Sequence, residues 1–410
     1  MKNKHTPLRL PGPLIITGIL TLIISGIISE SCQIQNPSDD ALLADKIINQ
    51  LKDSLNPDSR VALVSVKAEE SQNQLIIKGE TTDSFYYKSL IVELSKAEID
   101  WTDSIILLPD ESIGPQNWGL VNLSVANLRS QTGHSKEMAT QAIMGTPLRV
   151  FKKSGSWLYV QTPDKYLAWT NDAAVQVLTM QEHAIWKGSK RIIYLKDFGL
   201  ILSGPDNNAS AVSDIVMGSV LQCQESENGF YPVFLPDGRS GYLPVGDAAD
   251  FAQWKDLVQP AANSLETIGL EMIGRPYLWG GTSTKGFDCS GFVKTLYYMN
   301  GLVLSRDASQ QINQGETVTT DEGFDQLAAG DLLFFGRKAS TDRSERITHV
   351  GMYLSGGRYI HSSGRVKLNS FVKSDELYSQ YLVDIFVRAK RIMKVESTNS
   401  AIRISDHSWY

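Results

Sequence analysis

The stretch Gly-Phe-Asp-Cys-Ser-Gly-Phe, residues 286–292, places a cysteine where a glycine-rich loop changes into an apolar run with helical spacing. A thiol at the start of a helix faces the positive end of the helix dipole and unpaired N–H groups, and both favour the thiolate. We therefore interpret Cys289 as a nucleophile, on the condition that a histidine can reach it.

Two histidines follow in strand-like apolar runs, His349 in Thr-His-Val-Gly-Met-Tyr and His361 in Tyr-Ile-His-Ser-Ser. A Ser-Gly-Gly turn separates the runs, and antiparallel strands joined by a tight turn place such residues side by side. We assign Cys289 as nucleophile, His349 as general base and His361 as the group that orients His349. His407 lies close to the chain end and is a poor catalytic candidate. One thiol and two histidines lack a fourth ligand, so we expect no metal or other cofactor.

Composition predicts a globular protein with several domains. The 410 residues exceed one ordinary core, and 42% of them are hydrophobic and 20% charged. The net charge of -6 argues against a nucleic-acid partner, which would normally leave a basic footprint. Of the three cysteines, Cys223 lies in a strand-like run and is expected to be a buried structural thiol, so no disulfide framework is expected.

Residues 1–32 have the features of an export signal. Three basic residues precede the uncharged apolar run 14–28, which is shorter than the roughly 20 residues of a membrane-spanning helix. The following Ser-Glu-Ser-Cys resembles a bacterial lipoprotein signal, in which Cys32 would be acylated. Glu30 departs from the residues usual before that cysteine, and an uncleaved membrane anchor is the alternative. Either reading predicts a periplasmic or cell-envelope protein held at a membrane.

Three domains are predicted between the signal and the cysteine segment. Residues 33–112 follow the order helix, strand, strand, helix, strand, which resembles the small BON-like α+β modules of bacterial envelopes. Residues 113–178 and 179–250 each contain short strands separated by Gly, Pro, Asn and Asp, in the same order. They resemble two bacterial SH3-like all-β barrels, which usually bind wall ligands.

The last domain is predicted to span residues 260–392. A helix followed by an antiparallel sheet is the papain-like α+β plan, so the whole chain is expected to be multidomain. Residues 393–410 are expected to form a polar tail that frays. The expected elements of the last domain are a helix over 265–273, the cysteine helix, and strands over 330–335, 347–353 and 358–361.

The joint pattern of Tyr-Leu-Trp-Gly-Gly, Phe-Asp-Cys-Ser-Gly, Gly-Asp-Leu-Leu-Phe-Phe and Thr-His-Val-Gly resembles the NlpC-type cell-wall cysteine peptidases over residues 260–392. With two preceding SH3-like domains, the resemblance narrows to the γ-D-glutamyl-L-diamino acid endopeptidases. That family cuts peptidoglycan stem peptides between D-glutamate and the diamino acid, meso-diaminopimelate or lysine. Its cysteine, histidine and third polar residue correspond here to Cys289, His349 and His361.

The resemblance also implies a substrate pocket shared with the first SH3-like domain. In the family, an acidic residue in a His-x-x-Glu-Met pattern and a tyrosine near the domain's end bind the free amine of an N-terminal L-alanine. His-Ser-Lys-Glu-Met and Lys-Tyr-Leu-Ala-Trp assign these roles to Glu137 and Tyr166, with a solvated loop position as the alternative for Glu137. The other implied substrate contacts are Tyr277, Trp279, Asp288, Ser290 and Ser309, the last with Ala308 as an alternative.

Backbone N–H groups near the cysteine would stabilise the oxyanion. The N–H of Cys289 is the first donor, and the Tyr277 hydroxyl is a second donor unless that ring only packs.

Three functions compete on this reading. We expect a hydrolase acting on released stem peptides with a free L-Ala terminus, in muropeptide recycling or scavenging. The alternatives are an endopeptidase that remodels intact peptidoglycan and a tethered wall-binding adaptor with a vestigial catalytic domain. The complete set of Cys289, His349 and His361 argues against the adaptor. The expected partners are peptidoglycan stem peptides and, through a lipid anchor, a membrane.

Overall fold

A computed structural model of the protein describes residues 37–72, 74–393 and 401–410. The chain divides into Met1–Ser38 and a compact unit, Asp39–Tyr410, to which the elements below belong. The predicted export signal, including Cys32, lies outside the described residues. Among the residues that are described, no helix is long and apolar enough to cross a bilayer.

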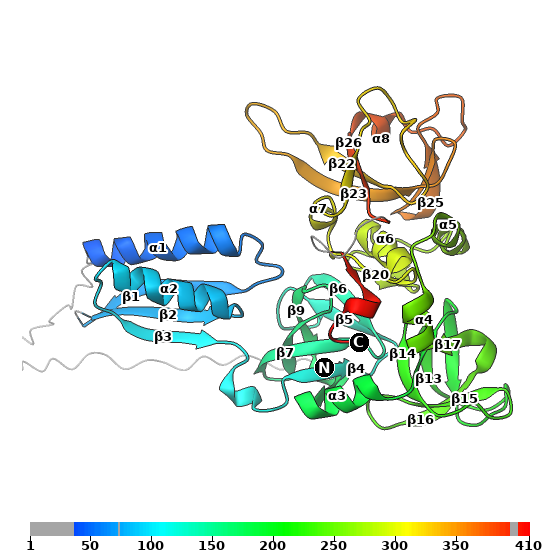
Figure 1. Ribbon diagram of the computed structural model, residues 1–410, viewed down its shortest axis with the longest axis horizontal. Coiled ribbons are helices and arrows are strands. Elements are labelled where there is room, and N and C mark those ends of the chain that lie inside the picture. Colours follow the sequence, from blue (N-terminus) through cyan, green and yellow to red (C-terminus); the bar gives the residue numbers. More distant parts are fainter. Residues whose placement is uncertain (1–36, 73, 394–400) are drawn as a thin grey trace, which may run out of the picture. The chain divides into compact units, whose positions relative to one another are not determined.

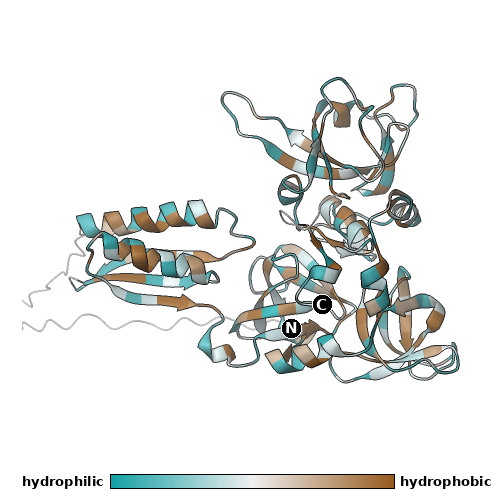
Figure 2. Ribbon diagram, in the orientation of Figure 1, coloured by the Kyte–Doolittle hydropathy of each residue, from teal (hydrophilic) through white to brown (hydrophobic). Residues whose placement is uncertain are grey.

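Two helices cover one face of a three-stranded sheet in the N-terminal α+β domain (Figure 1). Its elements are α1 (Asp39–Leu55), β1 (Val64–Ser71), β2 (Gln74–Thr81), α2 (Ser84–Lys96) and β3 (Thr102–Leu107). Brown and teal bands along both helices in Figure 2 mark an apolar side and a polar side. Ile48 of α1 and Leu90 of α2 are almost completely buried between helices and sheet. β1 pairs antiparallel and β3 parallel with β2, so the predicted element order is confirmed.

A seven-stranded antiparallel sheet follows, with the order β10-β4-β7-β8-β9-β5-β6. Val121, Val150 and Val160 have no exposed surface at its centre. The four predicted strands are present, but β4, β6 and β10 were not predicted. β6, for example, buries the polar side chains Thr140 and Gln141, which interrupt an apolar pattern. The elements are η1 (Glu111–Ile113), β4 (Trp118–Val121), β5 (Val125–Arg129), β6 (Met138–Ile143), β7 (Pro147–Ser154), β8 (Trp157–Gln161), β9 (Leu167–Asn171), η2 (Asp172–Ala174) and β10 (Val175–Leu178).

A second seven-stranded sheet has the order β13-β12-β16-β15-β14-β11-β17. Number the strands of each sheet from one to seven in chain order, and read the first sheet from β10 and the second from β17. Both sheets then have the spatial order seven, one, four, five, six, two, three. The predicted recurrence of strand order is therefore confirmed. Cys223 is buried, as expected, and is a free thiol. The elements are α3 (Met180–Gly188), β11 (Arg191–Tyr194), β12 (Phe198–Leu202), β13 (Ala211–Val216), β14 (Val220–Cys223), β15 (Phe230–Phe234), β16 (Ser240–Pro244), η3 (Val245–Asp247) and β17 (Ala248–Asp250).

The C-terminal domain has helices first and a six-stranded antiparallel sheet afterwards, as predicted. The sheet order is β21-β26-β22-β23-β24-β25, of which the sequence predicted the three central-region strands β22, β23 and β24. The elements are α4 (Phe251–Leu257), α5 (Ala262–Glu271), β18 (Thr282–Ser283), β19 (Gly286–Phe287), α6 (Cys289–Tyr298), β20 (Leu302–Val303), α7 (Ala308–Gln311), β21 (Glu316–Val318), β22 (Leu332–Arg337), β23 (Arg346–Tyr353), β24 (Arg358–Ser363), β25 (Arg365–Ser370), α8 (Gln380–Asp384) and β26 (Phe386–Arg391).

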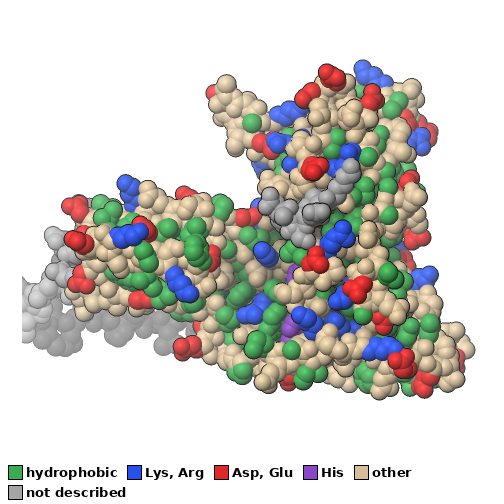
Figure 3. Space-filling view, in the orientation of Figure 1, with side chains coloured by type: hydrophobic (Ala, Val, Ile, Leu, Met, Phe, Trp, Pro, Cys, Tyr) green, Lys and Arg blue, Asp and Glu red, His purple; other side chains and the backbone are tan. Residues whose placement is uncertain are grey.

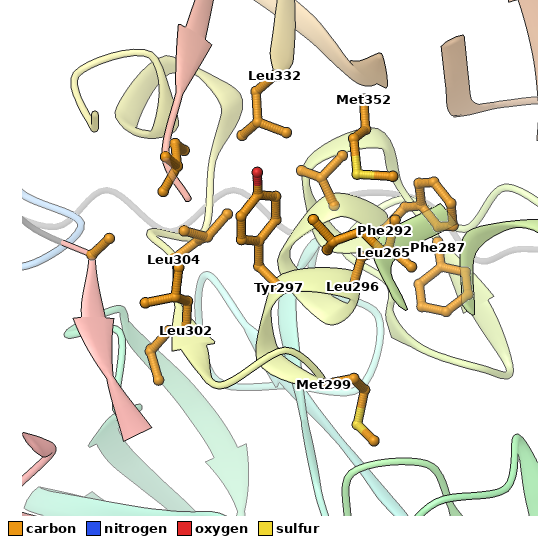
Figure 4. Close-up of a cluster of buried hydrophobic side chains, with 14 of the residues drawn as sticks. Leu265, Phe287, Phe292, Leu296, Tyr297, Met299, Leu302, Leu304, Leu332 and Met352 are labelled. Atoms are coloured by element: carbon orange, nitrogen blue, oxygen red, sulfur yellow. The ribbon is translucent and has the colours of Figure 1, made fainter. Parts of the chain in front are cut away.

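Helix α6 is fixed by an apolar cluster against the sheet (Figure 4). Phe292, Leu296 and Tyr297 have no exposed surface, and full burial of one such side chain contributes about 1.5–3 kcal/mol. In Figure 4 the Tyr297 ring points toward Leu332 of β22, and its hydroxyl donates to the Gly330 carbonyl at 2.5 Å. The N-terminus of α6, where Cys289 lies, is therefore held rigidly against the sheet.

Ion pairs join the C-terminal domain to both β-sheets before it. Lys294 Nζ lies 3.0 Å from Asp164, whose side chain is only 1% exposed, and Lys285 Nζ lies 2.6 Å from Asp214. Elsewhere acidic and basic side chains are interspersed, as the face in Figure 3 shows. Because removing one partner of a buried pair leaves an uncompensated charge, the Lys294–Asp164 pair holds the first sheet in register with α6.

The expectation of a fraying tail over residues 393–410 is wrong for residues 401–410. β27 (Ile402–Arg403) pairs antiparallel with β20, and η4 (Ile404–Asp406) follows it. Ile404, His407 and Tyr410 are buried. The segment looked polar by composition, but four of its side chains, among them Ile404 and Tyr410, are buried, which composition cannot show.

Candidate active site

Asp288 caps helix α6 and sets the position of Cys289. One carboxylate oxygen of Asp288 accepts from the Gly291 N–H at 2.7 Å, and the other accepts from the Gly280 N–H at 3.0 Å. Gly280 has φ +77°, and a Cβ there would meet the Met138 carbonyl oxygen at 2.3 Å. Glycine is therefore required where this loop passes β6, next to the predicted substrate residue Glu137.

A buried arginine ties the cysteine segment to the first β-sheet. The Arg306 guanidinium donates to Asp288, to Ser290 Oγ at 3.0 Å and to Thr140 Oγ1 of β6 at 2.9 Å, and Arg306 is only 1% exposed. Asp288 and Ser290, predicted as substrate contacts, are thus both buried and bonded within the protein. These contacts show that Asp288 and Ser290 help to hold the segment around Cys289 in place. Their roles as substrate contacts stay predictions.

The two predicted catalytic histidines lie side by side on β23 and β24. His349 Nε2 is 2.7 Å from His361 Nδ1, and His361 Nε2 is 2.9 Å from Asn369 Oδ1 of β25. The Asn369 amide nitrogen donates to the Leu377 carbonyl at 2.9 Å, so its oxygen must be the group that faces His361. His361 then donates from Nε2 and accepts at Nδ1, and His349 donates from Nε2. This chain of bonds leaves the lone pair of His349 Nδ1 free to take a proton.

The sulfur of Cys289 lies beside the peptide that joins His349 to Val350. The backbone N–H groups of Val350 and Ser290 hydrogen-bond to it. Burial nevertheless raises the pKa of the Cys289 thiol to about 11, with the Asp288 charge adding to the effect, and these hydrogen bonds and Arg306 oppose it. The N–H group at the helix start lowers the thiol pKa, as expected, but desolvation by burial outweighs it, and the net pKa is raised.

The predicted base, His349, also favours its neutral form. Burial, with smaller contributions from His361 and Lys367, lowers the pKa of His349 to about 3. Burial likewise lowers the pKa of His361 to about 4. Both shifts favour a neutral thiol beside a neutral imidazole, so we expect the proton to move during attack on a substrate rather than before binding.

The predicted amine-binding residues reach the C-terminal domain from the first β-sheet. Glu137 is exposed, and its carboxylate accepts from Trp279 Nε1 at 2.9 Å. The buried Tyr166 donates its hydroxyl proton to Asp307 Oδ2 at 3.2 Å. Sequence reasoning missed Asp307, although it lies in the same Ser-Arg-Asp-Ala-Ser segment as the predicted Ser309.

The remaining predicted contacts are found in two places. Tyr277 is half-buried, and burial first, then the charges of Cys289 and Asp288, raise the pKa of its hydroxyl to about 12. It therefore stays protonated at neutral pH, as an oxyanion donor must. Ser309 Oγ instead accepts from Arg60 of the N-terminal domain at 2.9 Å.

Comparison with known proteins decides the family. Residues 274–391 match the NlpC/P60 family, and residues 128–175 match the bacterial dipeptidyl-peptidase Sh3 domain. The chain is 30% identical over 237 residues to a gamma-D-glutamyl-L-lysine dipeptidyl-peptidase of Bacillus cereus, covering 56% of this chain and 68% of that protein. The protein of the same description from Bacillus subtilis is 30% identical over 236 residues, covering 54% and 71%. The chain belongs to the NlpC/P60 family.

A solved structure agrees in fold with this NlpC/P60 cysteine peptidase. The crystal structure of an NlpC/P60 family protein from Bacillus cereus superposes with a TM-score of 0.58 at 23% identity, over 67% of this chain and 99% of that one. Both the SH3-like domain and the C-terminal peptidase domain predicted from sequence are therefore present in this multidomain NlpC/P60 peptidase.

Proposed function

We propose that this peptidase hydrolyses the γ-D-glutamyl-L-diamino acid bond, with diaminopimelate or lysine, of peptidoglycan stem peptides that have a free N-terminal L-alanine. Its role would be muropeptide recycling or scavenging. The names of the two Bacillus relatives support the bond type. The observation that carries the proposal is the contact of Glu137 with Trp279 and of Tyr166 with Asp307, which brings two carboxylates to the boundary of the SH3-like and peptidase domains.

The hydrogen-bond chain supports a defined order of proton transfers. His349 Nδ1 takes the Cys289 proton as the sulfur attacks the γ-glutamyl carbonyl carbon, and His361 and Asn369 hold the ring in that orientation. The backbone N–H of Cys289 and the Tyr277 hydroxyl stabilise the oxyanion. His349 then gives the proton to the leaving amine of the diamino acid, and water hydrolyses the thioester.

The carboxylates of Glu137 and Asp307 would select the substrate's amino terminus. An ammonium group there makes charge-assisted hydrogen bonds, which are about twice as strong as neutral ones. An acetylated or muramoyl-linked alanine presents a neutral amide and would leave the carboxylates without a cation. The pocket thus favours released peptides over intact wall, which separates recycling from remodelling.

Digestion of matched peptides tests this proposal. The free peptide L-Ala-γ-D-Glu-L-Lys and its N-acetyl form are incubated with the protein, and products are identified by mass. Release of L-Ala-D-Glu from the free peptide alone supports the proposal. Equal cleavage of both forms, or of N-acetylmuramoyl-linked stems, would reject the amine pocket.

We also propose that the protein acts outside the cytoplasm as a lipoprotein attached through Cys32. The charge and length of the segment at residues 1–32 support this location. Cell fractionation compares the wild type with Cys32→Ser. A lipoprotein moves from the membrane fraction to the soluble fraction on this change, whereas an uncleaved anchor keeps the variant at the membrane.

A further inference from the structure

A loop of the N-terminal domain reaches the proposed amine pocket. The loop, residues 56–63, joins α1 to β1. The Arg60 carbonyl accepts from the Leu167 N–H at 2.7 Å, and the Val61 carbonyl accepts from Gln161 Nε2 at 3.0 Å. These bonds fasten the loop to β8 and β9, directly beside Tyr166.

The Arg60 side chain bridges two carboxylates. Its Nε and Nη2 each lie 2.8 Å from an oxygen of Asp58, and its Nη1 donates to Asp307 Oδ2 at 2.8 Å and to Ser309 Oγ at 2.9 Å. Gln310 Nε2 donates to Asp58 at 2.8 Å. Both members of this ion pair, Arg60 and Asp58, therefore bond the N-terminal domain to the segment that contains Asp307.

Asp307 lies between two arginines. Arg60 and Tyr166 both donate to its Oδ2, whereas the buried Arg306 is 3.9 Å from its Oδ1. Without Arg60, the Tyr166 hydroxyl and the start of helix α7, which Asp307 caps, would remain to oppose the attraction of Arg306. The carboxylate would then turn toward the buried guanidinium and away from an incoming ammonium group.

The charge of Arg60 itself does little to repel that ammonium group. Asp58 pairs with Arg60 through both oxygens, so the two charges balance. The Arg60–Asp58 ion pair therefore orients the Asp307 carboxylate and adds almost no net charge near it. This balance favours a positioning task over competition with the substrate for the carboxylate.

We propose that Arg60 is a positioning residue of the amine pocket, which holds the Asp307 carboxylate toward the substrate's ammonium group. The N-terminal α+β domain is then a third contributor to substrate selection and not only a spacer. The inference rests on the proposed function, because it assumes that Asp307 receives the amine.

Kinetics of the full chain with the free and N-acetyl peptides test the proposal. In Arg60→Ala, KM for the free peptide rises about tenfold, the effect of one lost orienting hydrogen bond to a charged group, while kcat stays within about twofold. Cleavage of the N-acetyl peptide does not change. Arg60→Lys, which keeps a donor to Asp307, restores most of the KM. In the Asp307→Asn background, Arg60→Ala adds no further rise.

Arg239→Ala is the matched control. Arg239 pairs with Asp237 two residues earlier, as Arg60 pairs with Asp58, and both members lie in the second β-sheet region. A fall in KM on Arg60→Ala would show competition with substrate, and an unchanged KM or an equal change with both peptides would likewise overturn the proposal. If the wild type cuts both peptides equally, the proposed function fails and this inference with it. A wild type that prefers the free peptide, with Arg60→Ala unchanged, refutes only the positioning role.

Discussion

Asn369 provides a sharp test of the hydrogen-bond chain behind the base. It contacts neither the cysteine nor the substrate region directly, but its Oδ1 accepts from His361 Nε2 at 2.9 Å. Asn369→Ala leaves the donor of a 99% buried histidine without an acceptor. The cost of such an unsatisfied buried group is about 1–3 kcal/mol. His361 is then free to turn or to change tautomer, and His349 loses its orienting partner.

That free energy converts into a rate. If the loss falls on the transition state, about 1–3 kcal/mol corresponds to a decrease in kcat of roughly 5- to 150-fold, with KM almost unchanged. Steady-state hydrolysis of L-Ala-γ-D-Glu-L-Lys measures both constants. Asn171→Ala is the control, since Asn171 makes the same kind of side-chain bonds at a cap in the first β-sheet.

A second substitution at this position separates orientation from charge. Asn369→Asp keeps an acceptor for His361 but places a negative charge near two buried imidazoles, and that charge raises the pKa of His361 most and of the more distant His349 less. The acid limb of kcat/KM then moves to higher pH than in the wild type. A folded Asn369→Ala variant with kcat within twofold of the wild type would refute the orienting chain.

The other predictions concern the nucleophile, the amine pocket and acid stability. Cys289→Ala should abolish turnover but still bind the peptide in calorimetry, and residual turnover would refute the nucleophile. Glu137→Gln should raise KM about tenfold for the free peptide only, the loss of one charge-assisted bond, and an unaltered KM would dismiss the carboxylate. Burial lowers the pKa of His361 and of His183 to about 4. Below pH 6.5 the unfolded state therefore binds more protons than the folded state. The free energy of unfolding is highest above pH 6.5 and falls as the pH approaches 4, by about 2 kcal/mol per histidine at pH 5. Urea unfolding at pH 7.5 and 5 measures this loss, and His183→Gln, away from the active site, should reduce it.

Local pattern was sufficient to place the two predicted catalytic histidines side by side. His349 and His361 each lay in an apolar run, and the Gly-Gly turn between the runs fixed their antiparallel pairing. Pairing of neighbouring strands is a short-range property, so the sequence carries it. Asn369 was missed because β25 contains Lys, Asn and Ser among its apolar residues, and nothing in its pattern marks one amide as a partner of histidine.

Properties that depend on distant contacts could not be read from the sequence. Asp307 and Arg60 are separated by 247 positions, and their bond forms only after the first β-sheet has brought their loops together. The pKa of the Cys289 thiol could not be predicted from the sequence for the same reason. The position of Cys289 at a helix start is local, but its desolvation comes from the sheet packed over it, and the desolvation is the larger effect.

Burial of Cys289 and His349 also bears on how the proposed selection at the substrate's amine would affect the chemistry. With the thiol pKa near 11 and the base pKa near 3, the resting pair stores no reactive thiolate. Proton transfer becomes favourable only when a carbonyl is positioned to accept the sulfur and the oxyanion donors are engaged. In the proposed function, binding energy from the ammonium group at Glu137 and Asp307 would supply that positioning. A peptide without a free amine would therefore lose rate as well as affinity, because the same contacts that hold it also align the bond that is cut.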